Sequence, residues 1–213
     1  MFSNIPPSAI TTTPDGVAPM EMLAKRPGRR GLHIVDYNPS WATDFSDLES
    51  RIRTALGPAA LDIHHVGSTS VPGLSARSVI DIDLVVADPA DEASYVPALE
   101  AAGFTLYFRQ PAYYGHRFFG CQTPDTNIHV YGPDCPDVAR HLILRDWLSE
   151  HPKDRDKYAA VKREVAVVAE EKGETGNQYG KRKEWVIREI LDRAFRANGL
   201  LPAGGGTSFE QGN

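Results

Sequence analysis

Two acids, Asp81 and Asp83, stand two positions apart inside an apolar run at residues 79–87. Side chains alternate between the two faces of a β-strand, so both carboxylates share one face. Carboxylates this close repel each other unless a cation or a hydrogen-bond donor lies between them, and their oxygens suit Mg²⁺ or Mn²⁺. The pattern predicts a buried strand that carries a divalent metal site. A salt-bridged surface pair is the alternative for an Asp-x-Asp strand taken alone.

A loop rich in glycine and hydroxyl groups precedes this strand. The loop follows another apolar segment at residues 61–66, and a Gly-Ser turn at a strand end offers backbone N–H groups to a phosphate. Hydroxyl side chains can add contacts, and an arginine between the loop and the acidic strand can neutralise phosphate charge. The predicted phosphate-binding residues of this segment are Gly67, Ser68, Thr69, Ser70 and Arg77. With the two acids they predict a metal-dependent nucleotide site.

Two later strands carry further candidates. Arg117, in the strand expected at residues 116–121, is a second cation for phosphate. His129, in the strand expected at residues 127–131, is a candidate catalytic residue beside the acids. It can ligate metal, act as a general base, or bind phosphate when protonated. A histidine that only satisfies the core is the alternative.

Two tyrosine-lysine pairs lie near the C-terminus. Tyr158 and Lys162 are one helical turn apart, and so are Tyr179 and Lys183, so each pair shares a helix face. Such pairs can stack on a base and neutralise phosphate, which makes Lys162, Tyr179 and Lys183 candidate nucleotide-binding residues. The same spacing is also common on ordinary solvated helix faces.

The periodicity predicts an α+β (mixed α/β) fold, because strands and helices alternate in the first part and only helices follow. We expect residues 1–30 to be a flexible leader with a basic, solvated end, for which a phosphate-contacting arm is the alternative. Residues 31–135 form the core, 136–197 a helical region packed on it, and 198–213 a flexible tail. Strands are expected at residues 32–37, 61–66, 79–87, 104–109, 116–121 and 127–131, with core helices at 40–56 and 91–102.

Composition narrows the function classes. The 213 residues carry 23 Lys+Arg against 28 Asp+Glu, a net charge of −5, so the basic face of a nucleic-acid binder is not expected. No apolar run approaches the roughly 20 residues of a membrane helix, and the start lacks the apolar segment of a secretory signal. The two cysteines, Cys121 and Cys135, match neither a disulfide framework nor a zinc pattern. We expect a cytoplasmic protein whose oligomeric state the sequence does not indicate.

The segments HVGSTSVPGL, SVIDIDLVV and NIHVY, followed by RHLILRDWLSEHPKDRDKYAAVK and NQYGKRKEWVIREIL, resemble the GrpB-like proteins. This family belongs to the DNA polymerase beta-like nucleotidyltransferase superfamily, and the resemblance covers roughly residues 33–195. It implies a nucleotidyltransferase-like mixed sheet flanked by helices, with a helical C-terminal region. It also implies that Gly67 and Ser68 form the superfamily's Gly-Ser motif and that Asp81 and Asp83 are its metal-binding acids.

The sequence departs from the superfamily pattern at two places. A third acid usually comes from a later strand, but the matching strand presents His129, a feature that the GrpB-like family shares. Arg77 replaces the lysine of a common Ala-Lys-Pro segment, which keeps the charge but not the point-charge geometry. Members of the family are sometimes fused to dephospho-coenzyme A kinase, which links the resemblance to nucleotide or coenzyme A metabolism.

The expected function is transfer of a nucleotidyl group from a nucleoside triphosphate, with ATP favoured, to a small-molecule acceptor. In this transferase Asp81 and Asp83 hold Mg²⁺ or Mn²⁺. Two alternatives remain open on the same scaffold. One is a ligase-type enzyme that forms an adenylate intermediate, and the other is a non-catalytic nucleotide-binding module.

Overall fold

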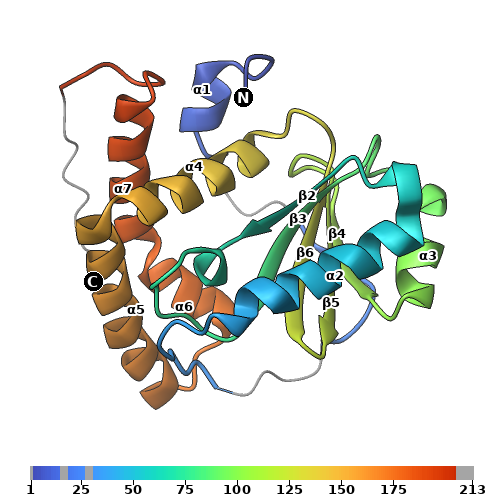
Figure 1. Ribbon diagram of the computed structural model, residues 1–213, viewed down its shortest axis with the longest axis horizontal. Coiled ribbons are helices and arrows are strands. Elements are labelled where there is room, and N and C mark those ends of the chain that lie inside the picture. The colour runs from blue at the N-terminus through green and yellow to red at the C-terminus, as the bar shows by residue number, and fades with distance from the viewer. Residues whose placement is uncertain (1, 15–18, 27–30, 205–213) are drawn as a thin grey trace.

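The computed structural model describes residues 2–14, 19–26 and 31–204. Within these residues one six-stranded sheet has the order β1-β4-β5-β6-β3-β2 (Figure 1). Strands β3 and β6 run parallel, and every other neighbouring pair is antiparallel. The α+β fold predicted from the sequence is therefore confirmed. The strands are β1 (Glu21–Met22), β2 (Asp62–Val66), β3 (Ile80–Val85), β4 (Thr105–Gln110), β5 (His116–Gln122) and β6 (Asp125–Tyr131).

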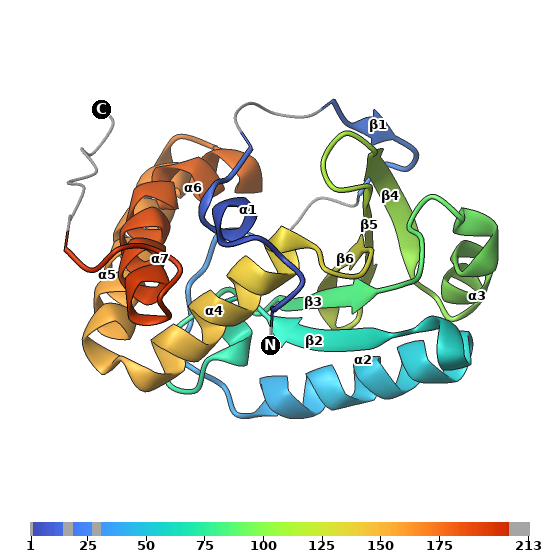
Figure 2. The ribbon, with the colours of Figure 1, turned by 90° about the horizontal axis from the view of Figure 1, so that it is seen from above.

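Helices cover both faces of the sheet, with α2 and α3 on one side and α4 on the other (Figure 2). The helix expected at residues 91–102 is divided into η3 and α3, and Pro97 lies in the first turn of α3, where its missing N–H costs no helical hydrogen bond. The α-helices are α1 (Pro7–Thr11), α2 (Ser40–Leu56), α3 (Val96–Ala101), α4 (Pro136–Glu150), α5 (Pro152–Glu171), α6 (Gly176–Arg182) and α7 (Glu184–Ala197). Short 3-10 turns are η1 (Gly57–Ala59), η2 (Ser68–Ser70) and η3 (Glu92–Ser94).

Strand β3 lies inside the sheet, between β2 and β6, as its apolar composition predicts. Its residues Ile80, Ile82 and Leu84 are fully buried in the main core, against apolar residues of α2 and α3. The opposite face of β3 carries Asp81 and Asp83 toward α4. The buried face of the strand therefore fixes the direction of both acids.

Helix α4 packs between the sheet and the C-terminal helices. Its residues Val138 and Leu142 pack with Val85 of β3. Ala139 and Ile143 contact α7 and α1 in a separate apolar cluster. Because α4 packs on the sheet through one side and on α1 and α7 through the other, the helical region is held against the face of the sheet that carries the acids.

The strand expected at residues 32–37 is wrong. Only Val35 forms a bridge, to Ala76. Leu32 and Ile34 pack against α5 and α6 rather than on the sheet. The alternating apolar residues of this segment thus face the C-terminal helices, and the segment remains an extended connection.

The first thirty residues are not a structureless leader where the structure describes them. Helix α1 buries Ile10 completely against α4 and α7, and β1 adds an edge strand beside β4. A few apolar residues in a Pro- and Ser-rich segment are enough to dock it. At the other end, Leu200 packs on the same cluster as α1. The parts of the expected leader and tail at residues 1, 15–18, 27–30 and 205–213 lie outside the described residues.

No helix among the described residues is long and apolar enough to cross a membrane.

Candidate functional site

A pocket of about 110 Å³ opens where the loop after β2 meets β3, α5 and α6. It gathers side chains from both the sheet and the helical region. The lining residues are Gly67, Ser68, Thr69, Arg77, Val79, Asp81, Tyr158, Lys162, Tyr179 and Lys183. Most of the residues that the sequence singled out therefore meet at one place, although they come from segments about a hundred residues apart. Of the predicted site residues, Ser70, Asp83, Arg117 and His129 are not in this lining.

Gly67 is needed for the approach of the loop to the first acid. Its φ of +70° is a conformation that side-chain-bearing residues rarely adopt, and a Cβ at this position would lie 2.4 Å from the Asp81 Oδ2 atom. Both the backbone conformation and the space thus require glycine. The loop backbone lies directly against the Asp81 carboxylate as a result.

The other oxygen of Asp81 is held by the parallel strand β6. Asp81 and Asn127 are in register on β3 and β6, and the Asn127 side-chain amide donates a hydrogen bond to Asp81 Oδ1. Asn127 was not among the sequence candidates. The alternation of the strand at residues 127–131 places it on the face of His129, but only the register between β3 and β6 shows which acid it meets.

Three basic side chains, those of Arg77, Lys162 and Lys183, line the pocket, and tyrosine rings pack against them. Lys162 is 2% exposed, and its Nζ lies 4.5 Å from the Tyr158 ring centroid and donates to the Ser75 carbonyl at 2.5 Å. Burial, reinforced by the neighbouring Lys183, lowers the pKa of Lys162 well below its ordinary value. Lys183 donates to the Tyr158 hydroxyl at 3.1 Å. These rings therefore position positive charge beside the cavity.

The tyrosines are not free platforms for a nucleotide base. Tyr158 and Tyr179 are 4% and 1% exposed. The Arg77 guanidinium lies 5.2 Å from the Tyr179 ring centroid, so that ring is covered by a cation rather than open to a ligand. The stacking role predicted for Tyr179 is not what this arrangement favours, since its ring faces are packed.

One nitrogen of the Arg77 guanidinium is not satisfied by the protein residues that the structure describes. Its Nη1 atom is buried and has no hydrogen-bond partner among the described residues. The hydroxyl of Ser75, next to the carbonyl that binds Lys162, is likewise buried and unpartnered. A buried donor without an acceptor costs about 1–3 kcal/mol, more when charged. An anionic ligand oxygen in the pocket would satisfy the guanidinium.

Two hydroxyls of the loop have structural partners. Thr69 Oγ1 donates to the Val79 carbonyl at 3.1 Å and lies 3.0 Å from His65 Nε2. Burial lowers the pKa of His65 to about 4, so its ring is neutral at pH 7. Ser70 Oγ donates to the Gly67 carbonyl at 2.6 Å. Thr69 thus ties the loop to the strands beside it, and Ser70 braces the loop internally, which disfavours the phosphate contacts predicted for both.

The second acid, Asp83, is completely buried beneath α4. Its Oδ2 lies 2.8 Å from Nδ1 of His141, and its Oδ1 is buried without a partner among the described residues. Burial alone would lower the pKa of His141, but Asp83 outweighs it and raises that pKa to about 9. His141 was missed in the sequence because nothing in the α4 pattern shows which residue lies over the strand.

His129 lies in a chain of neutral rings. Its Nδ1 is 3.0 Å from His116 Nε2, and His116 Nδ1 is 3.0 Å from Gln110 Oε1. Burial lowers the pKa of His129, and it lowers that of His116 to about 2. Of the roles considered for His129, phosphate binding as a cation is therefore disfavoured. Its place in register with Asp83 keeps it beside the second acid.

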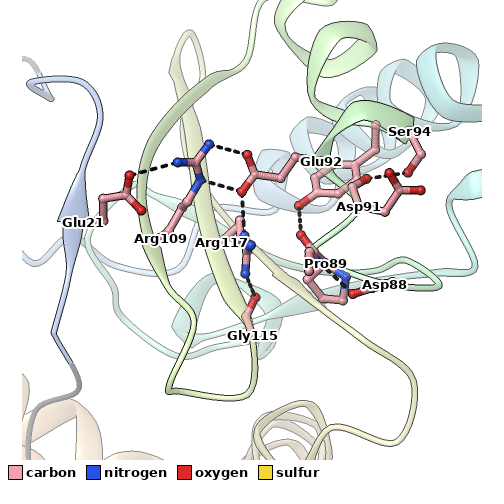
Figure 3. A network of polar contacts seen from close by, with 11 residues as sticks. Glu21, Asp88, Pro89, Asp91, Glu92, Ser94, Arg109, Gly115 and Arg117 are labelled. Atoms are coloured by element: carbon pink, nitrogen blue, oxygen red, sulfur yellow. Dashed lines mark hydrogen bonds and ion pairs between the residues drawn. The ribbon is translucent and has the colours of Figure 1, made fainter.

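Arg117 is not part of the site. Its register partner on β6 is Val130, which belongs to the core on the α2 face of the sheet. There its Nε donates to Glu92 at 2.8 Å and its Nη1 to the Gly115 carbonyl at 2.7 Å (Figure 3). Arg109 shares the same carboxylate. The phosphate-binding role predicted for Arg117 is disfavoured, because the alternation of β5 turns it to the face opposite the acids.

The pairing of His141 with Asp83 makes stability depend on pH. The folded-state pKa of about 9 exceeds the ordinary 6.5, so the pair stabilises fully below pH 6.5 and the gain is lost as pH rises through 9. We expect His141→Gln to lower the free energy of unfolding by about 1–2 kcal/mol at pH 6 and by much less at pH 9.5. Urea denaturation in EDTA measures both values, and the exposed His33→Gln is the control. Equal losses at the two pH values would contradict the assignment.

The fold and the pocket together define a mixed α+β protein with a candidate anion-binding site at the end of its central strands. The sequence profile of the family described as GrpB protein matches residues 31–193. The chain therefore belongs to the GrpB family, as the motifs predicted.

Several proteins are similar to this chain. A UPF0157 protein of Halalkalibacterium halodurans is 42% identical over 169 residues, which cover 79% of this chain and 85% of that protein. A UPF0157 protein of Streptomyces coelicolor is 40% identical over 78% of this chain and 86% of its own length. A dephospho-CoA kinase of Mycolicibacterium paratuberculosis is 28% identical over 78% of this chain but only 47% of its own length.

A solved structure shares the fold. The crystal structure of the conserved protein GrpB from Enterococcus faecalis has a TM-score of 0.66 to this chain. It is 22% identical in sequence and covers 78% of this chain and 99% of that one. This likeness supports the fold described above.

Proposed function

We propose that this protein binds the phosphates of a nucleoside triphosphate, with ATP favoured, and transfers the nucleotidyl group to a small-molecule acceptor. The observation that carries the proposal is the buried Nη1 of Arg77, which has no hydrogen-bond partner among the described residues. Arg77 lines a cavity together with Lys162 and Lys183, next to Asp81. Concentrated positive charge beside one carboxylate suits a polyphosphate that arrives with a metal ion.

The two acids fit a Mg²⁺ or Mn²⁺ ion. Mg²⁺ is usually bound by one or two carboxylates together with water and substrate phosphates, rather than by a complete protein cage. Among the described residues no group of three acids, histidines or cysteines is arranged as a metal site, so the phosphates would supply further ligands. Asp81 is partly exposed in the pocket, and Asp83, behind the pocket lining, has an Oδ1 with no partner among the described residues, so each acid has an oxygen to offer. When bound, the ion would offset the triphosphate charge and align the reacting groups.

The residues of the pocket have different roles in the proposed reaction. The backbone of Gly67 and Ser68 lies against Asp81, where it can donate to phosphate oxygens. Arg77 and Lys183 offset the negative charge that grows on the leaving pyrophosphate. The cavity of about 110 Å³ is small beside the roughly 300–1,000 Å³ of sites that enclose a whole drug-sized ligand. It therefore suits phosphate groups, with the sugar and base outside.

The family context supports phosphate chemistry. The superfamily that the motifs resemble transfers nucleotidyl groups, and some relatives bear the name dephospho-CoA kinase. We infer from these names that the acceptor belongs to nucleotide or coenzyme A metabolism.

Calorimetry with ATP and Mg²⁺, paired with a pyrophosphate-release assay over a set of small-molecule acceptors, tests the proposal. Arg77→Ala is expected to weaken ATP binding by on the order of tenfold or more, because it removes a charged donor from the pocket. Arg53→Ala, which removes a surface arginine of α2, serves as the control with no expected change. Equal ATP affinity in the wild type and Arg77→Ala would contradict the assignment of this pocket as the triphosphate-binding site.

A non-catalytic nucleotide-binding module is the second candidate, because His141 already occupies one oxygen of Asp83. The same assays separate the functions. Tight ATP binding without pyrophosphate release over the acceptor set supports the binding module. Release of AMP together with an amide product supports instead the ligase-type reaction through an adenylate.

A further inference from the structure

A segment outside the matched family region reaches the candidate site. The family profile begins at residue 31, but residues 19–26 are docked on the sheet. Strand β1 pairs with β4, and the backbone N–H groups of Leu23 and Ala24 both donate to the Tyr107 carbonyl, at 2.9 and 3.2 Å. This docking brings the next residues of the segment close to the start of β6.

Arg26 completes the connection. Its side chain is only 19% exposed, so the expectation of a solvated basic end does not hold for this residue. Its Nη1 donates to Asn127 Oδ1 at 2.6 Å, and its Nη2 donates to Asp125 Oδ1 and the Thr126 carbonyl, each at 3.0 Å. The guanidinium also lies 5.3 Å from the Phe118 ring centroid. Arg26 is thus fixed in place from several sides.

The bonds to Arg26 and to Asp81 favour the same orientation of the Asn127 amide. An asparagine side chain accepts through its oxygen and donates through its nitrogen. Because Arg26 donates to Oδ1, the Nδ2 group is directed at Asp81, where it donates to Oδ1 of the carboxylate. Without the guanidinium, the amide oxygen loses this hydrogen bond, so the amide is held less firmly against Asp81.

The neighbouring strand leaves room for this arrangement. Gly120 of β5 is in register with Asn127. A Cβ at residue 120 would lie 2.4 Å from the Thr126 carbonyl oxygen and 3.4 Å from Arg26 Nη2. A side chain there would obstruct the guanidinium and the strand together.

We propose that Arg26 is a positioning residue of the candidate site: it orients Asn127, which in turn fixes the Asp81 carboxylate. One consequence rests on the proposed function: binding of a metal-triphosphate would depend on a segment outside the matched family region. The hydrogen-bond relay from Arg26 through Asn127 to Asp81 is itself independent of that function.

Two measurements on the full chain test the relay. The first follows the Asn127 side-chain amide by ¹⁵N NMR without ligand. In the wild type we expect two distinct, exchange-protected protons, and in Arg26→Ala we expect clearly faster exchange of both. Lys25→Ala removes the same charge from the adjacent exposed residue and should resemble the wild type. An unchanged Asn127 amide in a folded Arg26→Ala protein would overturn the proposal.

The second measurement is the Mn²⁺-dependent affinity for tripolyphosphate, which contains no base or sugar. Arg26→Ala should weaken it by on the order of fivefold to tenfold. The same change in an Asn127→Ala background should have little further effect, because the relay is already broken. If Arg26→Ala weakened the affinity by the same fivefold to tenfold in that background, Arg26 would act by another route, and the relay would be overturned. If wild-type protein binds no Mn²⁺-tripolyphosphate, the proposed function fails, while the NMR result still decides the relay.

Discussion

Asp81→Asn is expected to change triphosphate binding in opposite directions with and without metal. Without metal, removing the carboxylate takes a negative charge from a pocket that holds Arg77, Lys162 and Lys183, so ATP should bind about threefold to tenfold more tightly. With Mg²⁺, the gain in affinity that the metal provides should fall by at least about tenfold, because the proposed ligand of the ion is lost. Calorimetry in EDTA and in Mg²⁺ measures both effects.

The control for this variant is Asp62→Asn, which changes an exposed acid on the neighbouring strand β2. It should leave both affinities unchanged. The asparagine at residue 81 has nearly the volume of aspartate and retains an oxygen that can accept from Asn127, so thermal melting should stay within a few degrees of the wild type. An Asp81→Asn protein that keeps the full metal-dependent gain would show that Asp81 does not hold the ion.

Gly67→Ala is expected to disable the pocket. The methyl group would lie 2.4 Å from Asp81 Oδ2, and alanine would be strained at a φ of +70°. The strain costs about 1–3 kcal/mol, and either the loop or the carboxylate must also move. We therefore expect a lower melting temperature and a loss of at least about tenfold in Mg²⁺-ATP affinity.

Gly57→Ala separates strain from collision. Gly57 has a φ of +51°, but a Cβ there would meet nothing within 4 Å. It should lose stability by a similar amount and bind ATP as the wild type does. If Gly67→Ala retained wild-type affinity, the contact between the loop and Asp81 would have no bearing on the site.

Local sequence patterns were enough to predict much of the fold. The apolar alternation around Asp81 and Asp83 places both acids on one face of the strand, independently of the rest of the chain. The helical spacing likewise places each tyrosine-lysine pair on one face of its helix. Arg117 shows where such local patterns fail, because a shift of one residue along a strand places a side chain on the opposite face of the sheet. Its direction follows from the pairing of β5 with β6, which the residue types near Arg117 do not specify.

The partners of the acids could not be predicted for a different reason. Asn127, His141 and Arg26 each reach the site from an element distant in sequence, through the parallel register, the placement of α4 and the docking of β1 respectively. These are tertiary relations with no local periodicity. The segment at residues 32–37 shows the same limit, because its apolar residues suit burial against helices as well as burial in a sheet.

The parallel pairing of β3 with β6 has a consequence for how the protein folds. The two residues joined there, Asp81 and Asn127, are 46 positions apart, and α3, β4 and β5 lie between them in the chain. Closing such a long segment costs entropy before any contact is gained, and non-local pairing of this kind slows folding. A nascent chain that has made only β2 and β3 therefore carries both acids but no working pocket. Ligand binding can then report the assembly of the sheet with the helices α5 and α6 during refolding.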